Sequence, residues 1–183
     1  MKELLNILRE ERREAYDHSQ RVGNYAFFLA IALGKDERTA DVWQNAGYLH
    51  DIGKITISED ILNAPRCLTA EERAEVAKHS INGADILSKS TWAKKEYIDA
   101  AKLHHQHFNA GGKAIPLVAR VIAVVDVYDA LTAKRCYKEG MTPRQAFEIM
   151  DDMQKNLQFD PDIYAAWKNV ISGVGNFIYA NVA

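Results

Sequence analysis

The chain has 183 residues, of which 48% are apolar, and its 23 lysines and arginines against 25 aspartates and glutamates give a formal net charge of −2. This length and composition are typical of one globular domain with one buried core, so we expect a single domain over residues 1–183. The near-neutral charge excludes the strongly basic surface of a general binder of DNA or RNA polymers.

No segment has the features of a membrane span or of an export signal. The longest uncharged apolar run, Ala26–Leu33, falls far short of the roughly 20 residues that a transmembrane helix needs. Charged residues interrupt positions 1–20, where a signal peptide would have its apolar stretch. The two cysteines, Cys67 and Cys136, provide neither a disulfide scaffold nor a Cys-rich zinc motif. We therefore expect a cytoplasmic protein that does not associate with membranes.

Helical periodicity predicts an all-α bundle of about seven helices. Apolar residues recur at steps of three and four along most of the chain, and no stretch alternates convincingly with a period of two. In chain order, we expect helices over residues 2–34, 36–53, 69–87, 91–105 and 117–133, then one that begins at Thr142 and a last one that begins at Asp160.

Particular residues mark several of these boundaries. Thr69 with Glu72, and Thr142 with Gln145, have the spacing of capping boxes at helix N-termini. The valine-rich residues 117–125 taken alone could form a buried strand, but the length of the whole apolar run favours a helix.

The first predicted helix has additional apolar positions near its N-terminus. These are Leu4, Leu5 and Leu8, which precede the main apolar stripe of that helix. We expect that this end of the helix could mediate a homodimer.

Ionisable side chains occur at apolar positions or at the ends of the predicted helices. His18, for example, lies on the apolar stripe of the first helix, with Glu14 one turn earlier on the same face. The full set of candidates is Glu14, His18, His50, Asp51, His79, His104, His105 and Asp126. Because burial of so many ionisable groups without partners would be very costly, we expect them to meet one another or a metal.

The number of candidate ligands favours a polynuclear metal centre. A single catalytic ion takes about three protein ligands, so eight groups are too many for one ion. Adjacent helical residues point about 100° apart, so His50 and Asp51, like His104 and His105, should serve neighbouring ions, with Asp51 as the bridge. Two ions roughly 3.5–4 Å apart are typical of phosphoester hydrolysis. The mixture of imidazoles and carboxylates suits Fe, Mn, Co, Ni or Zn.

Lys54 follows three residues after Asp51 and adds a positive charge beside the expected metals. It could hold a phosphate oxygen or balance the charge of a transition state. We therefore expect Asp51 and Lys54 to be the catalytic residues, with a water that attacks the phosphorus of a phosphodiester.

The motifs together resemble the HD-GYP branch of the HD-domain metal-dependent phosphohydrolases. They occur in the order of that family over about residues 14–161, and they are His18-Ser19-x-Arg21-Val22, His50-Asp51-Ile52-Gly53-Lys54, Leu68-Thr69-x-Glu71-Glu72, His79, Gly83, His104-His105 and Val125-Asp126-Val127-Tyr128-Asp129-Ala130-Leu131. The resemblance implies a helical bundle around two or three divalent transition-metal ions, Fe or Mn first, and hydrolysis of cyclic di-GMP.

The resemblance also implies roles for particular residues. By position, the metal ligands are His18, His50, Asp51, His79, His104, His105 and Asp126, and Glu14 matches a ligand of a third metal in some members. Lys54, Arg135 and Lys138 match positions that face the substrate phosphates, and Asp129 matches a position that supports a ligand.

The loop that names the HD-GYP branch departs from its pattern, HHExxDGxGYP. Gln106 replaces the glutamate, Asn109 replaces the aspartate, the GYP tripeptide is absent, and Cys136 replaces a usual proline. Three functions therefore stay open: a cyclic-dinucleotide phosphodiesterase, a phosphohydrolase of another nucleotide or phosphoester, and a metal-containing binding module without catalysis.

Overall fold

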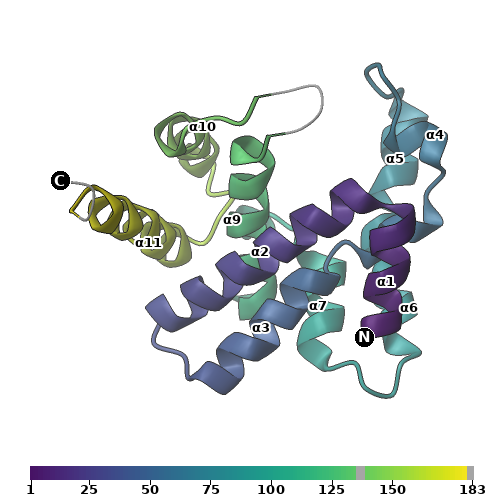
Figure 1. Cartoon of the computed structure of the whole chain (residues 1–183), viewed down its shortest axis with the longest axis horizontal. Coiled ribbons are helices and arrows are strands. Elements are labelled where there is room, and N and C mark those ends of the chain that lie inside the picture. Colours follow the sequence, from purple (N-terminus) through teal and green to yellow (C-terminus); the bar gives the residue numbers. More distant parts are fainter. Residues whose placement is uncertain (135–138, 181–183) are drawn as a thin grey trace.

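The computed structural model describes the backbone of residues 1–134 and 139–180 and their side chains as far as residue 173. Over these ranges every regular element is a helix, which confirms the all-α prediction (Figure 1). The α-helices are α1 (Lys2–Glu11), α2 (Arg13–Ala32), α3 (Glu37–Leu49), α4 (Glu59–Leu62), α5 (Ala70–Ala77), α6 (His79–Ser88), α7 (Lys95–Leu103), α8 (Phe108–Gly111), α9 (Leu117–Thr132), α10 (Pro143–Lys155) and α11 (Pro161–Ala180); η1 (Ile52–Thr56) and η2 (Gly112–Ala114) are 3₁₀-helices.

The single helix expected over residues 2–34 is wrong, because the chain breaks into α1 and α2 at Arg12. Arg12 leaves the helical conformation, with φ −141° and ψ 57°. Its guanidinium donates hydrogen bonds to Glu59 Oε1 at 2.7 Å and to the carbonyl oxygen of Ile57 at 3.0 Å. These bonds secure the turn, so α1 lies at a steep angle to α2 and contacts η1 (Figure 1).

The apolar residues of α1 are used inside the chain. Leu8 is fully buried in the core, and Leu4 and Leu5 pack against it while remaining partly exposed. The apolar side chains that suggested a homodimer are therefore packed within the chain. The homodimer through this helix stays a prediction.

The helix expected over residues 69–87 is also divided, into α5 and α6. The capping box of Thr69 and Glu72 at the start of α5 is confirmed, as is that of Thr142 and Gln145 at α10. At Lys78 the backbone N–H bonds the carbonyl of Glu75, three residues earlier, which tightens the turn and separates the two helices.

Helix α9 is the central element of the bundle, and the helical prediction for its valine-rich sequence is confirmed. It contacts α2, α3, α7, α10 and α11, and its valines and isoleucine face the core. In the ranges that the structure describes, no helix has the length and apolarity that a membrane crossing requires.

Helices α2 and α3 approach each other closely at two glycines. A Cβ atom on Gly47 would lie 2.6 Å from the Cα of Gly23, so the contact leaves no room for a side chain. This approach brings the rings of His18 on α2 and His50 at the end of α3 within 5.3 Å, measured between centroids.

Candidate metal centre

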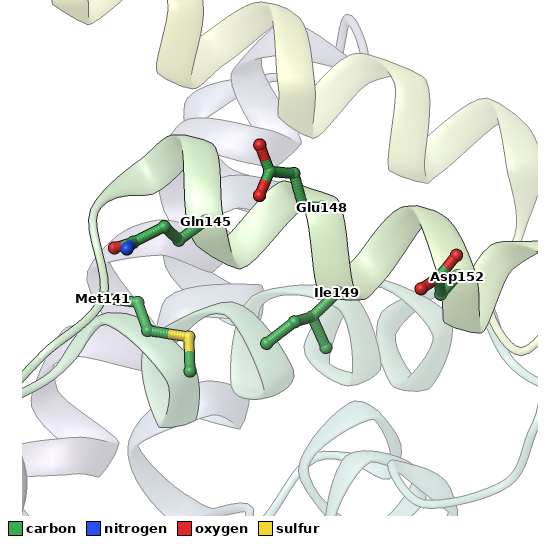
Figure 2. Close-up of a pocket in the computed structure, with 5 residues that line it drawn as sticks. All are labelled: Met141, Gln145, Glu148, Ile149 and Asp152. Atoms are coloured by element: carbon green, nitrogen blue, oxygen red, sulfur yellow. The ribbon is translucent and has the colours of Figure 1, made fainter.

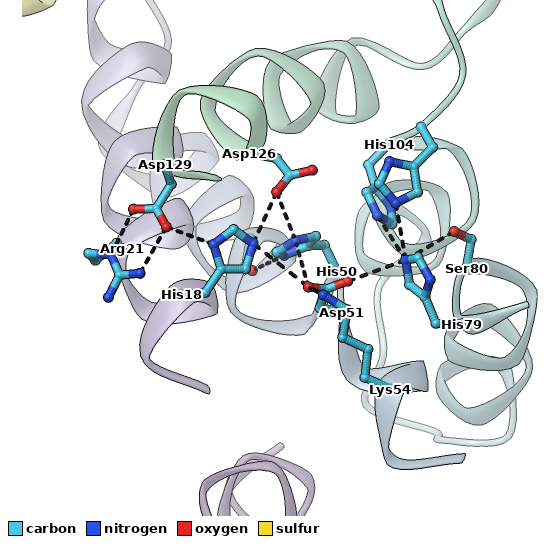
Figure 3. A network of polar contacts seen from close by, with 12 residues as sticks. His18, Arg21, His50, Asp51, Lys54, His79, Ser80, His104, Asp126 and Asp129 are labelled. Atoms are coloured by element: carbon cyan, nitrogen blue, oxygen red, sulfur yellow. Dashed lines mark hydrogen bonds and ion pairs between the residues drawn. The ribbon is translucent and has the colours of Figure 1, made fainter. Parts of the chain in front are cut away.

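Five helices and the turn after α3 bring seven of the eight predicted ligands into one region (Figure 3). Three groups have ligand atoms that all lie within 4.8 Å of one another: His18, His50 and Asp51; His50, His104 and Asp126; and His79, His104 and His105. His18, His50, Asp51, His79 and His104 are buried, with at most 5% of each residue exposed. The Asp126 side chain is 13% exposed, and His105 is exposed at the surface.

The sequence-adjacent pairs lie in the same groups, and the expectation that each pair serves two neighbouring ions stays a prediction. His50 and Asp51 share one group, and His104 and His105 share another. Both pairs lie just beyond the ends of helices, and Asp51 has φ −99° and ψ 9°. The first residue of each pair still has helical backbone angles, with φ −57° and ψ −35° at His50 and φ −63° and ψ −20° at His104.

The Nε2 atoms of the histidines have the spacing of ligands around shared ions. His79 Nε2 lies 3.3 Å from His104 Nε2 and 3.2 Å from His105 Nε2. On the other side, His18 Nε2 lies 3.0 Å from Asp126 Oδ1. Donor atoms that bind one ion at about 2.1 Å lie about 3.0–3.4 Å from one another, so the residues fit a metal.

The opposite ring nitrogens are held by hydrogen bonds, which orients the rings. The Nδ1–H groups of His50, His79 and His104 donate to the carbonyl oxygens of Gly47 at 2.7 Å, Val76 at 2.6 Å and Ala100 at 2.9 Å, respectively. These bonds leave the lone pair on Nε2, as metal-binding histidines require. His50 Nε2 is buried and has no hydrogen-bond partner within the described part of the chain, which is unusual unless a ligand occupies the site.

The environment sets the charges that metal binding needs. Burial lowers the pKa of His50 and His79, and it lowers the pKa of His104 to about 3. His105 is exposed as a residue, but its Nε2 lies against His79, and this partial burial of the ring lowers its pKa as well. Burial by itself would raise the pKa of Asp51, but the charge of Lys54 and the nearby histidines hold that pKa well below its usual range. At neutral pH these imidazoles are therefore neutral and the carboxylate is ionised, so both are ready to bind a cation.

His18 differs from the other histidines in its protonation. Burial acts to lower its pKa, but hydrogen bonds to Asp126 and Asp129 and the charges of Asp126 and Asp51 outweigh burial and raise the pKa to about 9. In the metal-free protein at pH 7.5, His18 is therefore an imidazolium, and its Nε2 must lose a proton before it can bind a metal.

We expect metal binding at pH 7.5 to release about one proton per chain, because the pKa of His18 lies above this pH and those of the other histidines lie below it. Metal affinity should rise about tenfold per pH unit between pH 7 and 8 and level off near pH 9. Calorimetric titration with Mn(II) in buffers of different ionisation enthalpy measures the proton count. If the wild-type protein releases no proton when it binds Mn(II), and the His18→Gln variant behaves in the same way, His18 is not the group that loses the proton.

Asp51 connects the two sides of the centre. Its Oδ2 lies 3.5 Å from His50 Nε2 and 3.7 Å from His18 Nε2, and its Oδ1 lies 3.3 Å from His79 Nε2. Lys54 Nζ donates to Asp51 Oδ2 at 2.5 Å. One carboxylate therefore faces two groups of histidines with different oxygens, which is the geometry of a bridging ligand.

Comparison with known families agrees with this site. The family model of the HD domain matches residues 2–163. The chain belongs to the HD domain family. This family consists of metal-dependent phosphohydrolases, and its relatives place the chain on the HD-GYP branch.

Related proteins of the HD family have named activities. The 3'3'-cGAMP-specific phosphodiesterase 2 of Vibrio cholerae is 37% identical over 171 residues, which cover 87% of this chain and 32% of that protein. A cyclic di-GMP phosphodiesterase of Pseudomonas aeruginosa is 32% identical over 177 residues, which cover 92% of this chain and 42% of that protein. The chain thus spans less than half the length of these relatives.

A solved HD domain has the same fold. The HD domain of the L. monocytogenes phosphodiesterase PgpH superposes with a TM-score of 0.71 at 20% identity, over 96% of this chain and 98% of that one. The structure of that domain in complex with cyclic-di-AMP superposes with a TM-score of 0.70.

Three further residues that the sequence analysis selected are not members of these groups among the described residues. Glu14 is exposed, one turn before His18 on α2, and lies outside the three groups that the described residues form. Arg135 and Lys138 fall outside the described residues. The roles of these three residues remain predictions.

The structure adds two residues to the HD site that the sequence analysis did not select for it. Ser80 Oγ lies 3.3 Å from His79 Nε2, and Arg21 forms two hydrogen bonds with Asp129, which in turn bonds His18 (Figure 3). Arg21 follows His18 by three residues and so shares its helix face, a spacing that could have indicated its role.

The HD-GYP signature loop follows His105 and folds into α8 and η2. The side-chain amide of Asn109 donates to the carbonyl oxygen of Asn156 at 2.7 Å, and its backbone N–H donates to Leu157 O at 2.9 Å. Asn109 therefore fastens this loop to the turn between α10 and α11.

A separate cavity of about 300 Å³ lies along α10 (Figure 2). It is lined by Met141, Gln145, Glu148, Ile149 and Asp152, and none of the candidate ligands of the HD domain contributes to it. We expect the chemistry at the histidine and aspartate cluster, where the donor atoms converge.

Proposed function

We propose that this HD domain hydrolyses a cyclic dinucleotide, with cyclic di-GMP as the leading substrate, at a centre of two or three divalent metal ions. The observation that supports the proposal most strongly is Asp51, whose two oxygens face His50 and His79 on opposite sides. Two ions that share a ligand are the usual arrangement for phosphoester hydrolysis. The names of the relatives, which include cyclic di-GMP and 3'3'-cGAMP phosphodiesterases, support the substrate class.

The ligands divide into two sides. His18, His50, Asp126 and one oxygen of Asp51 would hold one ion, and His79, His104, His105 and the other oxygen of Asp51 would hold the second. Glu14 would join a third. This donor set suits Fe or Mn and is compatible with Zn, Ni or Co. Ions held here lower the pKa of water and neutralise the charge of the phosphodiester.

The side chains of the domain have distinct tasks in this reaction. Asp51 accepts a hydrogen bond from the attacking water and orients it toward phosphorus. Lys54, whose side chain is 25% exposed, contacts the phosphate oxygens and balances the charge that develops on them. Arg135 and Lys138 contact the phosphates of the dinucleotide. A new P–O bond forms to the water oxygen as the P–O bond to one ribose oxygen breaks. The water gives up a proton, the departing ribose oxygen takes one up to become a hydroxyl group, and the ring opens to a linear dinucleotide.

The altered signature loop supports a second candidate, hydrolysis of another nucleotide or phosphoester. Gln106 and Asn109 replace two acidic residues of the HD-GYP pattern, and Asn109 is engaged with Asn156. A loop with different charges and a fixed position would present a different surface to the substrate.

We expect protein purified without oxygen and loaded with Fe(II) or Mn(II) to convert cyclic di-GMP to the linear dinucleotide or GMP. Chromatography of the reaction measures the products, with 3'3'-cGAMP, cyclic di-AMP and bis(p-nitrophenyl) phosphate tested in parallel. Turnover of only another phosphoester would favour the second candidate. No product from any of them, with metal content confirmed, would indicate a binding module without catalysis.

A further inference from the structure

His18 differs from the other three buried histidines in how its Nδ1 atom is held. The Nδ1–H groups of His50, His79 and His104 bond backbone carbonyls three or four residues earlier in the chain. Such carbonyls are fixed by the local backbone. His18 Nδ1 instead bonds a side chain, the carboxylate of Asp129 on α9, at 2.7 Å.

The orientation of His18 therefore depends on what holds Asp129. Arg21 donates two hydrogen bonds to this carboxylate, from Nε to Oδ1 at 2.7 Å and from Nη2 to Oδ2 at 2.9 Å. The paired bonds set the plane of the carboxylate, because the guanidinium is flat and binds both oxygens. Oδ2 also accepts the bond from His18, so the arginine and the histidine meet at one oxygen (Figure 3).

The same spacing of three residues occurs on α2 and on α9, the two helices that hold the His18 ring. His18 and Arg21 are three residues apart on α2, and Asp126 and Asp129 are three residues apart on α9. Asp126 faces Nε2 of the histidine ring and Asp129 faces Nδ1, so the ring is held between the two carboxylates.

We propose that Arg21 is a positioning residue of the metal centre: it fixes Asp129, which directs His18 Nε2 toward the ion-binding side. The inference rests on the proposed function only in requiring that the centre binds divalent ions. Asp129 is almost fully buried, with 1% of its side chain exposed, while the side chain of Arg21 is 41% exposed. Without its cation, a buried carboxylate turns toward other donors or water, and it then no longer holds the ring in place.

The test compares Arg21→Gln and Arg21→Lys with the control Arg66→Gln. Arg66 makes a similar paired interaction, with both bonds to Glu72 at 2.7 Å, at the start of α5 and outside the metal centre. The readouts are the affinity for Co(II), measured by competition with a chelator, and the visible absorption bands of the bound Co(II), which report the ligand geometry. Circular dichroism of the metal-free variants checks that each is folded.

We expect Arg21→Gln to weaken the binding of one Co(II) ion by about 10–100-fold and to change its absorption bands. Arg21→Lys keeps the charge but loses the paired geometry, so its affinity should fall between those of the wild type and Arg21→Gln. Arg66→Gln should match the wild type in both readouts.

Wild-type affinity and bands in a folded Arg21→Gln variant would overturn the inference. So would equal losses in Arg21→Gln and Arg66→Gln, which would indicate a general effect of removing an ion pair. A wild-type chain that binds no Co(II) would overturn both this inference and the proposed function. A chain that binds Co(II) and hydrolyses no phosphoester would overturn only the proposed function. The ratio of the Co(II) affinities of the wild type and Arg21→Gln would still decide the role of Arg21.

Discussion

Replacement of Asp51 by asparagine is expected to lower the turnover of cyclic di-GMP by about 1,000-fold or more, about 4 kcal/mol of transition-state stabilisation, and to lower the metal content of the protein. The variant keeps the size of the side chain, so the helices around it should remain in place. It removes the negative charge that lies between the two groups of histidines.

The geometry explains why this one residue should matter so much. The two oxygens of Asp51 face histidines of different groups, at 3.5 Å from His50 Nε2 and 3.3 Å from His79 Nε2. Asp126 also lies near histidines of both groups, His50 and His104, but the ion-pair distances show its Oδ1 near His18 and His50, whereas Asp51 presents a different oxygen to each group. Loss of its charge also weakens the hydrogen bond that the Lys54 ammonium donates to Oδ2.

The measurement combines steady-state turnover with metal analysis of the same preparations. Asp41→Asn is the matched control, because Asp41 is an exposed aspartate on α3, the helix that precedes Asp51. The control should keep both activity and metal content. An Asp51→Asn protein that is fully active with normal metal content would show that Asp51 is neither a bridge nor a catalytic residue.

Substitution of Gly53 by alanine is expected to destabilise the fold by about 3 kcal/mol or more, which corresponds to a fall in melting temperature of at least about 6 °C for a protein of this size. Gly53 lies in η1, the 3₁₀-helix that begins directly after the His50–Asp51 pair. An added Cβ atom would lie 1.9 Å from the carbonyl oxygen of His79 and 2.6 Å from the backbone nitrogen of Gly83.

The size of this effect follows from what the methyl group would meet. Both close contacts are backbone atoms of α6, which cannot rotate away as a flexible side chain could. Relief of the clash must therefore separate η1 from α6. Because Asp51 directly precedes η1 and His79 begins α6, the same movement should weaken metal binding.

Gly173→Ala provides the opposite control. Gly173 lies in α11, and a Cβ atom there would meet nothing within 4 Å. Alanine is favoured over glycine inside a helix, so this variant should be more stable than the wild type by about 0.5–1 kcal/mol. Thermal or urea unfolding of the metal-free proteins compares the two. An unchanged unfolding midpoint for Gly53→Ala would contradict the close packing of η1 on α6.

Much of the local structure could be predicted from the sequence because its causes lie within a few residues. Thr69 with Glu72 and Thr142 with Gln145 form the capping boxes that their spacing indicates. The apolar run from residue 117 forms the helix that its length favours. The helix break at Arg12 was not predicted, because Arg12 is held by Glu59 and Ile57, which lie more than 40 residues later in the chain. The break at Lys78 was not predicted either, although the bond that tightens it is local.

The sequence by itself determined the all-α fold and indicated seven of the residues that meet in the candidate metal centre, because periodicity, caps and histidines at apolar positions are visible in short stretches. Only the tertiary structure decided how these residues are grouped. The placement of Asp51 between two groups depends on how α2, α3, α6 and α9 pack, and the link from Arg21 to Asp129 joins residues 108 positions apart. Such contacts depend on the distances between packed helices, which no local sequence pattern specifies.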